Sequence, residues 1–327
     1  MNKIQLLFLS AFAGIMLFGS SCVRDGEEAC PSYLRIVYDY NMEYTDLFHR
    51  EVSFLSIFMF DAETGVLVRE VKQAQDPFPE DYTFRVPAEW IGDNYDIVAW
   101  AGLDPDSYEF PTLTPGVSTI HDFQLRVKDY ENQVVNRTTA LEPLWHGKLE
   151  NVSFSGQEEI HTVSLRKDTR KFRLVVQSID EDYVVESDHL DIRIHSSGGW
   201  YDNANRVLDP KDRGIVYHPY YTQDDPEVGA IAELNSMRLI DDGRENRLVI
   251  GNRESGKAIL DISLMKYLNA LRLLEHANLP FQEYLDREDE YYILVFLQKV
   301  PGGPEDGNWL AVQIEINQWI IRIQDID

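Results

Sequence analysis

Cysteine is nearly absent from this chain of 327 residues, which contains two. Two cysteines exclude both a multi-disulfide framework and a Cys-rich zinc site. Basic residues are also few, because 30 Lys and Arg face 56 Asp and Glu and give a formal net charge of −26. Nucleic-acid affinity depends on cationic side chains that displace counterions, so we expect no nucleic-acid partner. The 44% hydrophobic and 12% aromatic content excludes a disordered chain and is sufficient for about two packed domains.

Known catalytic and nucleotide-binding motifs are missing as well. The sequence has no His-Glu-x-x-His, no Gly-x-Ser-x-Gly and no glycine-rich phosphate loop before a helix. Its eight histidines are scattered without a pair at ligand spacing, and we interpret His146 as a core or surface residue and not as a catalytic base. The acidic segments 104–106 and 305–308 do not match an EF-hand loop, and the run 286–290 is interpreted as solvated. We therefore expect no metal site, no cofactor and no enzymatic activity.

The N-terminus has the pattern of a secretory signal. Lys3 precedes an apolar stretch from Ile4 to Phe18, and three small residues then lead to Cys22. This pattern is typical of a signal peptide and too short for a membrane span. A cysteine directly after small residues indicates bacterial lipoprotein processing, so we expect a signal peptide at 1–21 and lipidation of Cys22. Gly19 stands where the usual lipobox has Leu, and the alternative is a plain signal peptide with a cysteine near the cut by chance.

Residues 22–32 form the expected lipidated tether. Three carboxylates follow Cys22 within six residues. This acidic stretch is either a solvated linker or, because it looks like the export signal of Bacteroidetes lipoproteins, a signal for surface exposure. No other segment approaches 18 consecutive apolar residues, so we expect a soluble ectodomain held by lipid at the outer membrane. Cys30 then has no intramolecular partner, and its role stays open.

Strand patterns dominate the chain after the tether. Apolar residues alternate from Leu34 to Tyr40 and occupy both faces from Val52 to Phe60, as in a central strand. The turn at 61–65 leads into 66–71, which predicts a hairpin. Further strands are predicted at 82–86, 95–101, 123–127, 152–154, 162–165, 172–176, 190–194, 247–250, 258–262, 291–297 and 310–316.

This spacing of short strands predicts an all-β fold of sandwich type. We expect two β-domains at 33–166 and 167–327, with the boundary in the charged run 166–171. The second domain carries one predicted helix, 263–278, whose leucines follow helical spacing. Ser263 is its expected cap, and a proline lies just beyond its end. The apolar stripe is expected to pack on the second domain, with partner binding as the alternative.

Several motifs in a fixed order resemble those of a known family, the FimB-type fimbrial anchor lipoproteins of Bacteroidales. These proteins are the anchor and accessory subunits of fimbrillin (type V) pili. The motifs are Cys30-Pro31 before the 34–40 segment, Asp39–Met42, Phe58–Asp61 with Thr64-Gly65, Tyr95–Leu103, Pro143–Gly147, Met237–Leu239, Tyr284–Arg287, and Ile314–Asn317 with Trp319. The resemblance therefore extends over nearly the whole chain.

The resemblance implies a fold and a role. The fold would be two tandem transthyretin-like β-sandwich domains, and the role a non-enzymatic, lipidated subunit that attaches the pilus to the outer membrane. Such subunits are thought to join by strand complementation, in which one chain completes a neighbour's sheet through main-chain hydrogen bonds. The implied partners are pilin subunits and, through acylated Cys22, outer-membrane lipid. Some relatives are tip or accessory subunits, so both positions stay open.

The C-terminus and two alternatives complete these expectations. Only a short tail follows the last predicted strand, so we expect a terminal subunit that donates no long strand, and deletion of 323–327 should leave fibre attachment unchanged. Arg50 lies in a segment expected to be exposed, but nothing marks it as a protease site.

One alternative function is that of a surface glycan-binding lipoprotein, although most of the six tryptophans lie beside strand patterns and are expected in the core. The other is a secreted hydrolase, which needs carboxylates clustered in a pocket.

Overall fold

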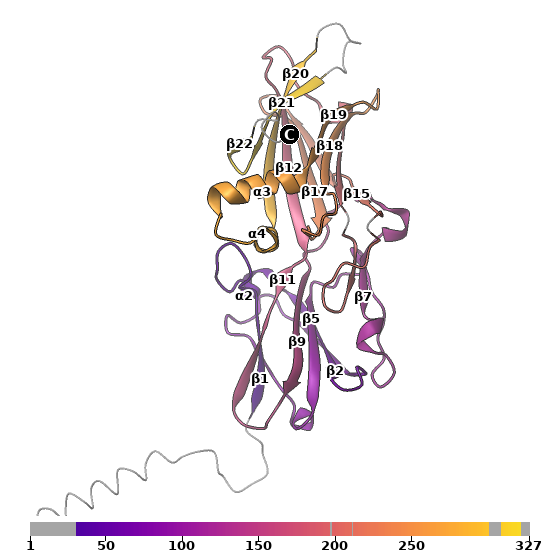
Figure 1. The fold of residues 1–327 in the computed structure, drawn as a ribbon, viewed down its shortest axis with the longest axis vertical. Helices are drawn as coiled ribbons and strands as arrows, with labels where there is room; N and C mark the ends of the chain where they lie inside the picture. The colour runs from indigo at the N-terminus through magenta and orange to yellow at the C-terminus, as the bar shows by residue number, and fades with distance from the viewer. Residues whose placement is uncertain (1–30, 197, 211, 301–308, 322–327) are drawn as a thin grey trace, which may run out of the picture.

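The computed structural model of the protein describes residues 31–300, apart from 197 and 211, and residues 309–321. The expected signal peptide, Cys22, Cys30 and the segment 323–327 lie outside the described residues. The prediction of a β-rich fold is confirmed, because the described chain forms several sheets and few helices. Figure 1 shows an N-terminal half and a C-terminal half stacked along the long axis. Within the described residues, no helix has the length and apolar character that a bilayer crossing requires.

In the N-terminal half, a five-stranded sheet packs on a three-stranded sheet. The strand order of the larger sheet is β11 (Arg166–Lys167), β9 (Trp145–Ser153), β5 (Asn94–Ala101), β2 (Phe54–Asp61) and β3 (Leu67–Ala74). The order of the smaller sheet is β10 (Glu159–Ser164), β1 (Ser32–Val37) and β4 (Thr83–Arg85). Leu34 and Ile36 of β1 share one core with Leu55 and Ile57 of β2. The predicted alternation of β1 therefore reflects a buried face and a more exposed face.

The strand predicted at 34–40 ends earlier, at Val37. Side chains replace sheet partners for the backbone that follows. The Tyr38 amide donates to the Asp46 carboxylate at 2.9 Å, and the Asn41 amide group donates to the Tyr38 carbonyl oxygen at 2.8 Å. Local side-chain hydrogen bonds of this kind compete with the sheet and end the strand.

Strand β2 is buried on both faces, as its sequence predicts. Leu55, Ile57 and Met59 belong to the core shared with β1, whereas Phe58 and Phe60 belong to a second core. The second core includes Phe123, whose ring lies 4.8 Å from that of Phe58. The long connection between β5 and β9 thus supplies a third layer over the outer face of the larger sheet.

The C-terminal half also contains two packed sheets. A six-stranded sheet has the order β16 (Tyr221–Asp225), β17 (Gly229–Met237), β12 (Thr169–Ser178), β20 (Glu290–Lys299), β21 (Trp309–Ile316) and β22 (Trp319–Ile321). A five-stranded sheet has the order β19 (Ala258–Ser263), β18 (Arg247–Asn252), β13 (Leu190–Ser196), β15 (Ile215–Tyr217) and β8 (Val134–Val135). Alternate residues of β12 and β20, including Leu174 and Ile293, share one core with Ile192 and Ile194 of β13.

Strands cross between the two halves of the chain. The short strand β8 from the N-terminal half pairs with β15 of the C-terminal half. In the opposite direction, β14 (Trp200–Asp202) joins β7 (Gln124–Val127) and β6 (Tyr108–Glu109) in a three-stranded sheet. The core that contains Phe58 of β2 also contains Phe172 of β12, so apolar packing is continuous between the halves.

The helices are few and short. The predicted helix is confirmed as α3 (Leu264–Glu275), and the Ser263 hydroxyl accepts from the Lys266 amide at its start. Four apolar residues of α3 are buried in the core of the C-terminal half, but Leu274, predicted in the same stripe, is 57% exposed. The other helical segments of the described residues are α2 (Phe48–Glu51), α4 (Phe281–Arg287), and the 3-10 turns Ala88–Trp90, Ile120–Asp122, Tyr130–Asn132 and Ser187–His189.

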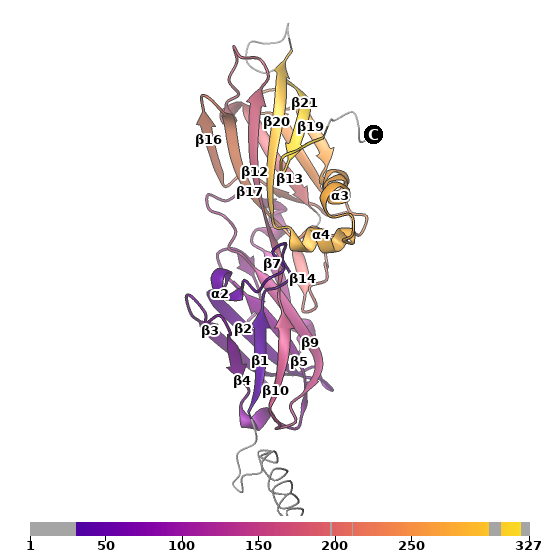
Figure 2. The same ribbon diagram turned by 90° about the vertical axis from the view of Figure 1, so that its left-hand side faces the viewer.

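The prediction of a single helix was incomplete, because α4 follows directly after Pro280. Proline suits the start of a helix, where its missing N–H has no partner to lose. Helix α4 lies next to the end of α3, at the level where the two halves meet (Figure 2).

Candidate functional site

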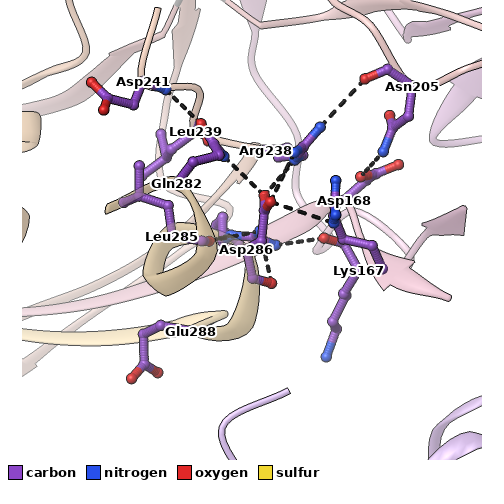
Figure 3. Close-up of polar contacts among 12 residues, drawn as sticks. Lys167, Asp168, Asn205, Arg238, Leu239, Asp241, Gln282, Leu285, Asp286 and Glu288 are labelled. Atoms are coloured by element: carbon purple, nitrogen blue, oxygen red, sulfur yellow. Dashed lines mark hydrogen bonds and ion pairs between the residues drawn. The ribbon is translucent and has the colours of Figure 1, made fainter. Parts of the chain in front are cut away.

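A buried polar network lies where the two halves meet, and Figure 3 shows its members. They come from α4, from the segment after β17, from the residues between β11 and β12, and from the loop after β14. These segments are far apart in the sequence. The network therefore depends on the assembled fold.

The centre of the network is an ion pair between Arg238 and Asp286. The Arg238 Nε atom lies 2.5 Å from Asp286 Oδ1, and Nη2 lies 2.9 Å from Oδ2. This bidentate geometry is the strongest form of an Arg–carboxylate contact. The Gln282 amide, one helical turn earlier, also donates to Asp286 Oδ1 at 2.9 Å. Arg166 Nε lies 3.4 Å from Oδ2, and Asp286 itself is 2% exposed.

A second part of the network surrounds the link between β11 and β12. The Asn205 amide donates to Asp168 Oδ1 at 2.7 Å, and the Asn205 carbonyl oxygen accepts from Arg238 at 3.3 Å. Arg170 is fully buried, and its guanidinium donates to the carbonyl oxygens of Leu285, Lys167 and Thr169. The charged run that was expected to mark a domain boundary is therefore partly buried and holds α4 in place.

Burial governs the electrostatics of this region. It raises the pKa of Asp168 to about 6, although Arg238 and the Asn205 amide oppose the shift. It lowers the pKa of His146 to about 4, which keeps that imidazole neutral at physiological pH. Burial also acts to lower the pKa of Arg238, but the Asp286 carboxylate outweighs it and raises that pKa. The Arg238 guanidinium is thus charged over the whole physiological pH range.

Aromatic and ionic contacts continue the junction toward its surface. The centre of the Tyr40 ring lies near two guanidinium groups, 4.7 Å from Arg166 Cζ and 4.1 Å from Arg287 Cζ. The Lys167 ammonium contacts the carboxylates of Glu51 and Asp289, so it joins α2 of the N-terminal half to the strand entry of β20. Cation–π contacts of this kind become stronger when they are partly removed from water.

A cavity of about 570 Å³ opens beside the junction. It is lined by Glu43, Glu51, Lys167, Glu288, Asp289, Glu290, Tyr292, Asn317 and Gln318. Burial and the neighbouring Asp289 raise the pKa of Glu288 to about 7. In the described part of the chain, however, no three His, Cys, Asp or Glu side chains are grouped so that they could hold a metal ion.

The junction has the properties of a structural clamp. Arg238 and Asp286 satisfy one another, Arg170 donates to backbone carbonyls, and the central pair is nearly excluded from solvent. Of the Asp168 carboxylate, Oδ1 accepts from Asn205, whereas Oδ2 is buried without a hydrogen-bond partner among the described residues. A catalytic site needs convergent groups that a substrate can reach. The described geometry instead favours a fixed orientation of the two halves.

The sequence located some of these residues and missed others. Four of the motifs that carry the family resemblance contribute to the junction: Asp39–Met42, Pro143–Gly147, Met237–Leu239 and Tyr284–Arg287. His146, which was interpreted as a core or surface residue, is buried, and its Nε2 atom lies 2.9 Å from the Asn203 carbonyl oxygen. The interpretation of 286–290 as a solvated run was wrong for Asp286. The available signal was Pro280 followed by Tyr284 and Leu285, which together indicate a short helix with a buried face.

The other candidate residues lie away from the junction or outside the described residues. The expected lipidation site Cys22 is outside them. Arg50 lies in α2 and is exposed. Trp90, Trp100 and Trp145 are core residues, as expected, whereas Trp319 is 39% exposed.

Comparison with known proteins places this architecture among fimbrial proteins. A family model described as the fimbrillin-A associated anchor proteins Mfa1 and Mfa2 matches residues 27–325. A solved structure from Bacteroides thetaiotaomicron, provisionally described as polysaccharide-binding, is 36% identical, with coverage of 90% of this chain and 99% of its own and a TM-score of 0.77. A second protein from that organism, provisionally described as an adhesin, is 26% identical over 91% of this chain and 100% of its own, with a TM-score of 0.75.

The fimbrial anchor protein Mfa2 from Porphyromonas gingivalis has the same fold. It is 20% identical, and the match covers 90% of this chain and 99% of that protein with a TM-score of 0.68. A search of curated proteins found no match.

Proposed function

The chain belongs to the family of fimbrillin-A associated anchor proteins, and we propose that it is a lipid-anchored subunit that attaches a type V pilus to the outer membrane or caps its end. The family match over residues 27–325 carries this proposal. The partners are then pilin subunits and, through an acylated Cys22, the lipid of the outer membrane. The protein acts as a structural component and needs no catalytic group or cofactor.

The proposed domain structure is two tandem transthyretin-like β-sandwiches at 33–166 and 167–327. Two packed pairs of sheets support it, one in each half. The crossing strands β8 and β14 and the buried Arg238–Asp286 pair join the domains into one unit. An anchor has to transmit the pull of a fibre to the membrane, and a junction of this kind resists bending between the domains.

Strand complementation is the proposed mode of contact with a pilin. The six-stranded sheet of the C-terminal half ends on one side at β16, where four of the five side chains are exposed. An edge strand offers free backbone donors and acceptors to an added strand. The β16 edge therefore supplies a place where an extended pilin segment can pair.

Replacement of Cys22 by Ala tests the anchor function most simply. Loss of the acyl chains removes the membrane attachment, since each methylene buried in the bilayer contributes about 0.8 kcal/mol to the free energy of membrane binding. We expect the protein to leave the membrane fraction and the fibres to appear in the medium. Cys30→Ala is the matched control and should leave both in place. Fibres that stay on Cys22→Ala cells would contradict the proposal.

Glycan binding at the cell surface is the second candidate. It rests on the 36% identical protein that is provisionally described as polysaccharide-binding. Exposed aromatic rings suited to sugar stacking are present at Tyr292 and Trp319. A glycan array with the purified chain separates the two functions. Micromolar binding that Trp319→Ala abolishes, together with unchanged fibres in Cys22→Ala cells, would favour glycan binding.

A further inference from the structure

We infer that the end of the C-terminal half farthest from β1 is the docking surface for the next fimbrial subunit, and that this subunit presents Lys or Arg side chains around an apolar centre. The surface, called here the distal tip, consists of Ile179, Tyr183, Val184, Lys299, Val300 and Trp309 with the carboxylates of 180–188 and 224–227. The inference rests on the proposed function and extends the pilin contact from the β16 edge, whose last residues Asp224 and Asp225 belong to the tip, to the end of the C-terminal half.

Exposed apolar side chains gather at the distal tip. Ile179, Tyr183, Val184 and Val300 are between 41% and 51% exposed. They come from the connection after β12 and from the end of β20. The two segments are joined by a hydrogen bond in which the Ile179 amide donates to the Leu297 carbonyl oxygen at 2.9 Å. A cluster of exposed apolar residues with a polar rim is typical of a protein interaction site.

Two aromatic rings and a lysine side chain form the centre of the tip. The Lys299 ammonium lies 3.9 Å from the centre of the Tyr183 ring and 6.0 Å from that of Trp309. The two rings are 6.4 Å apart in an edge-to-face arrangement. The Asp180 carboxylate accepts from the Lys299 amide at 2.9 Å and fixes the loop to the end of β20. Preorganised aromatic side chains lose little entropy on binding and are frequent interface hot spots.

The rim of the tip is acidic. Segments 178–189 and 221–228 contain eight Asp and Glu residues and no Lys or Arg. Asp224 links the two segments, because its carboxylate accepts from the Ser187 amide at 2.7 Å. Glu181 and Asp182 are exposed, and the described part of the chain provides neither with an ion-pair partner. Uncompensated carboxylates around an apolar centre favour a basic partner and steer its approach.

The position of the tip fits the role of an anchor. The described chain begins with β1 in the N-terminal half, at the opposite end of the long axis (Figures 1 and 2). The residues before β1 form the proposed lipid tether. If they hold that end at the membrane, the distal tip faces away from it, toward the fibre.

The experiment measures binding of fimbrial subunits to the full-length, detergent-solubilised chain. The probe is the subunit protein purified from sheared fibres of the bacterium that carries this gene. The test variants are Glu181→Lys/Asp182→Lys, which reverses the rim charge, and Tyr183→Ser, which removes the aromatic centre. The control is Glu80→Lys/Asp81→Lys, an adjacent pair of the same two residue types that is exposed in the N-terminal half.

We expect each tip variant to weaken binding at least about tenfold, and the control to bind like the wild type. Raising NaCl from about 50 mM to about 500 mM should weaken the wild type and have little effect on the rim variant. Unchanged thermal unfolding of each variant shows that folding is intact. Tip variants that bind like the wild type would overturn the tip as the docking surface. A wild-type chain that binds no fimbrial subunit would overturn the proposed function as well.

Discussion

Replacing Asp286 by Asn tests the clamp between the two halves. The substitution keeps the shape of the side chain and removes its charge. In the wild type this carboxylate is 2% exposed, binds Arg238 through both oxygens and lies 3.4 Å from Arg166 Nε. An amide has a single acceptor oxygen, and its NH2 group would face a guanidinium donor. The variant therefore leaves the buried Arg238 guanidinium without its hydrogen-bonded carboxylate.

The expected cost follows from burial. Removing one partner of a buried ion pair costs about 3–5 kcal/mol, because the other charge stays buried. Asp261→Asn is the matched control, since Arg247 Nε contacts Asp261 Oδ1 at 2.8 Å but the two side chains are 37% and 40% exposed. Exposed pairs of this kind contribute about 0–1 kcal/mol. The two variants differ in burial and share the same chemistry.

Urea unfolding followed by tryptophan fluorescence gives the free energies of unfolding. Asp286→Asn should lower the free energy by about 3 kcal/mol or more, and Asp261→Asn by less than about 1 kcal/mol. A transition that splits into two steps in Asp286→Asn would show that the halves have become independent. Equal losses in the two variants would refute the reasoning, because burial would then have no effect.

Two further substitutions test the junction. Burial raises the pKa of Asp168 in the folded protein from 3.8 to about 6. The wild type should therefore lose free energy of unfolding as pH rises between these two values, because the folded state holds the proton more tightly than the unfolded state. Asp168→Asn should gain stability relative to the wild type over the same pH range, as measured by urea titrations at several pH values. A pH-independent difference would contradict this sign. Gly102 has φ +75°, and an added Cβ would lie 1.9 Å from the Pro143 carbonyl oxygen. Gly116 has nearly the same φ, +76°, but open space around it. Gly102→Ala should therefore lower the melting temperature clearly more than Gly116→Ala does. Similar melting temperatures for the two alanine variants would show that the close approach is not limiting.

Local features of the fold were predictable from the sequence. The double-sided apolar pattern of 52–60 predicted a central strand, and β2 does lie between β5 and β3. The leucine spacing and Ser263 predicted α3 to within three residues at its C-terminal end. The family resemblance drawn from ordered motifs is confirmed by the match over residues 27–325. These signals are contained in short windows or in the order of motifs along the chain.

Non-local features were not predictable in the same way. Asp286 stands in a run of five charged residues, and its partner Arg238 is 48 positions away, so no window of the sequence contains the pair. Strands β8 and β14 have two and three residues, too few to show a period, and they exist because the opposite half supplies their partners. Leu274 fits the helical stripe but is 57% exposed, as is its neighbour Leu273 at 56%, because α3 ends at Glu275 and its last turn leaves both side chains outside the core.

The position of the protein on the fibre tests the anchor function most directly. Immunogold electron microscopy of intact cells, with antibodies raised against the N-terminal half, locates each copy relative to a fibre. We predict gold particles at one end of each fibre, with the cell-proximal end labelled if the protein is the base anchor. Gold spaced along the fibre shafts, or on cell surfaces without any relation to fibres, would contradict it.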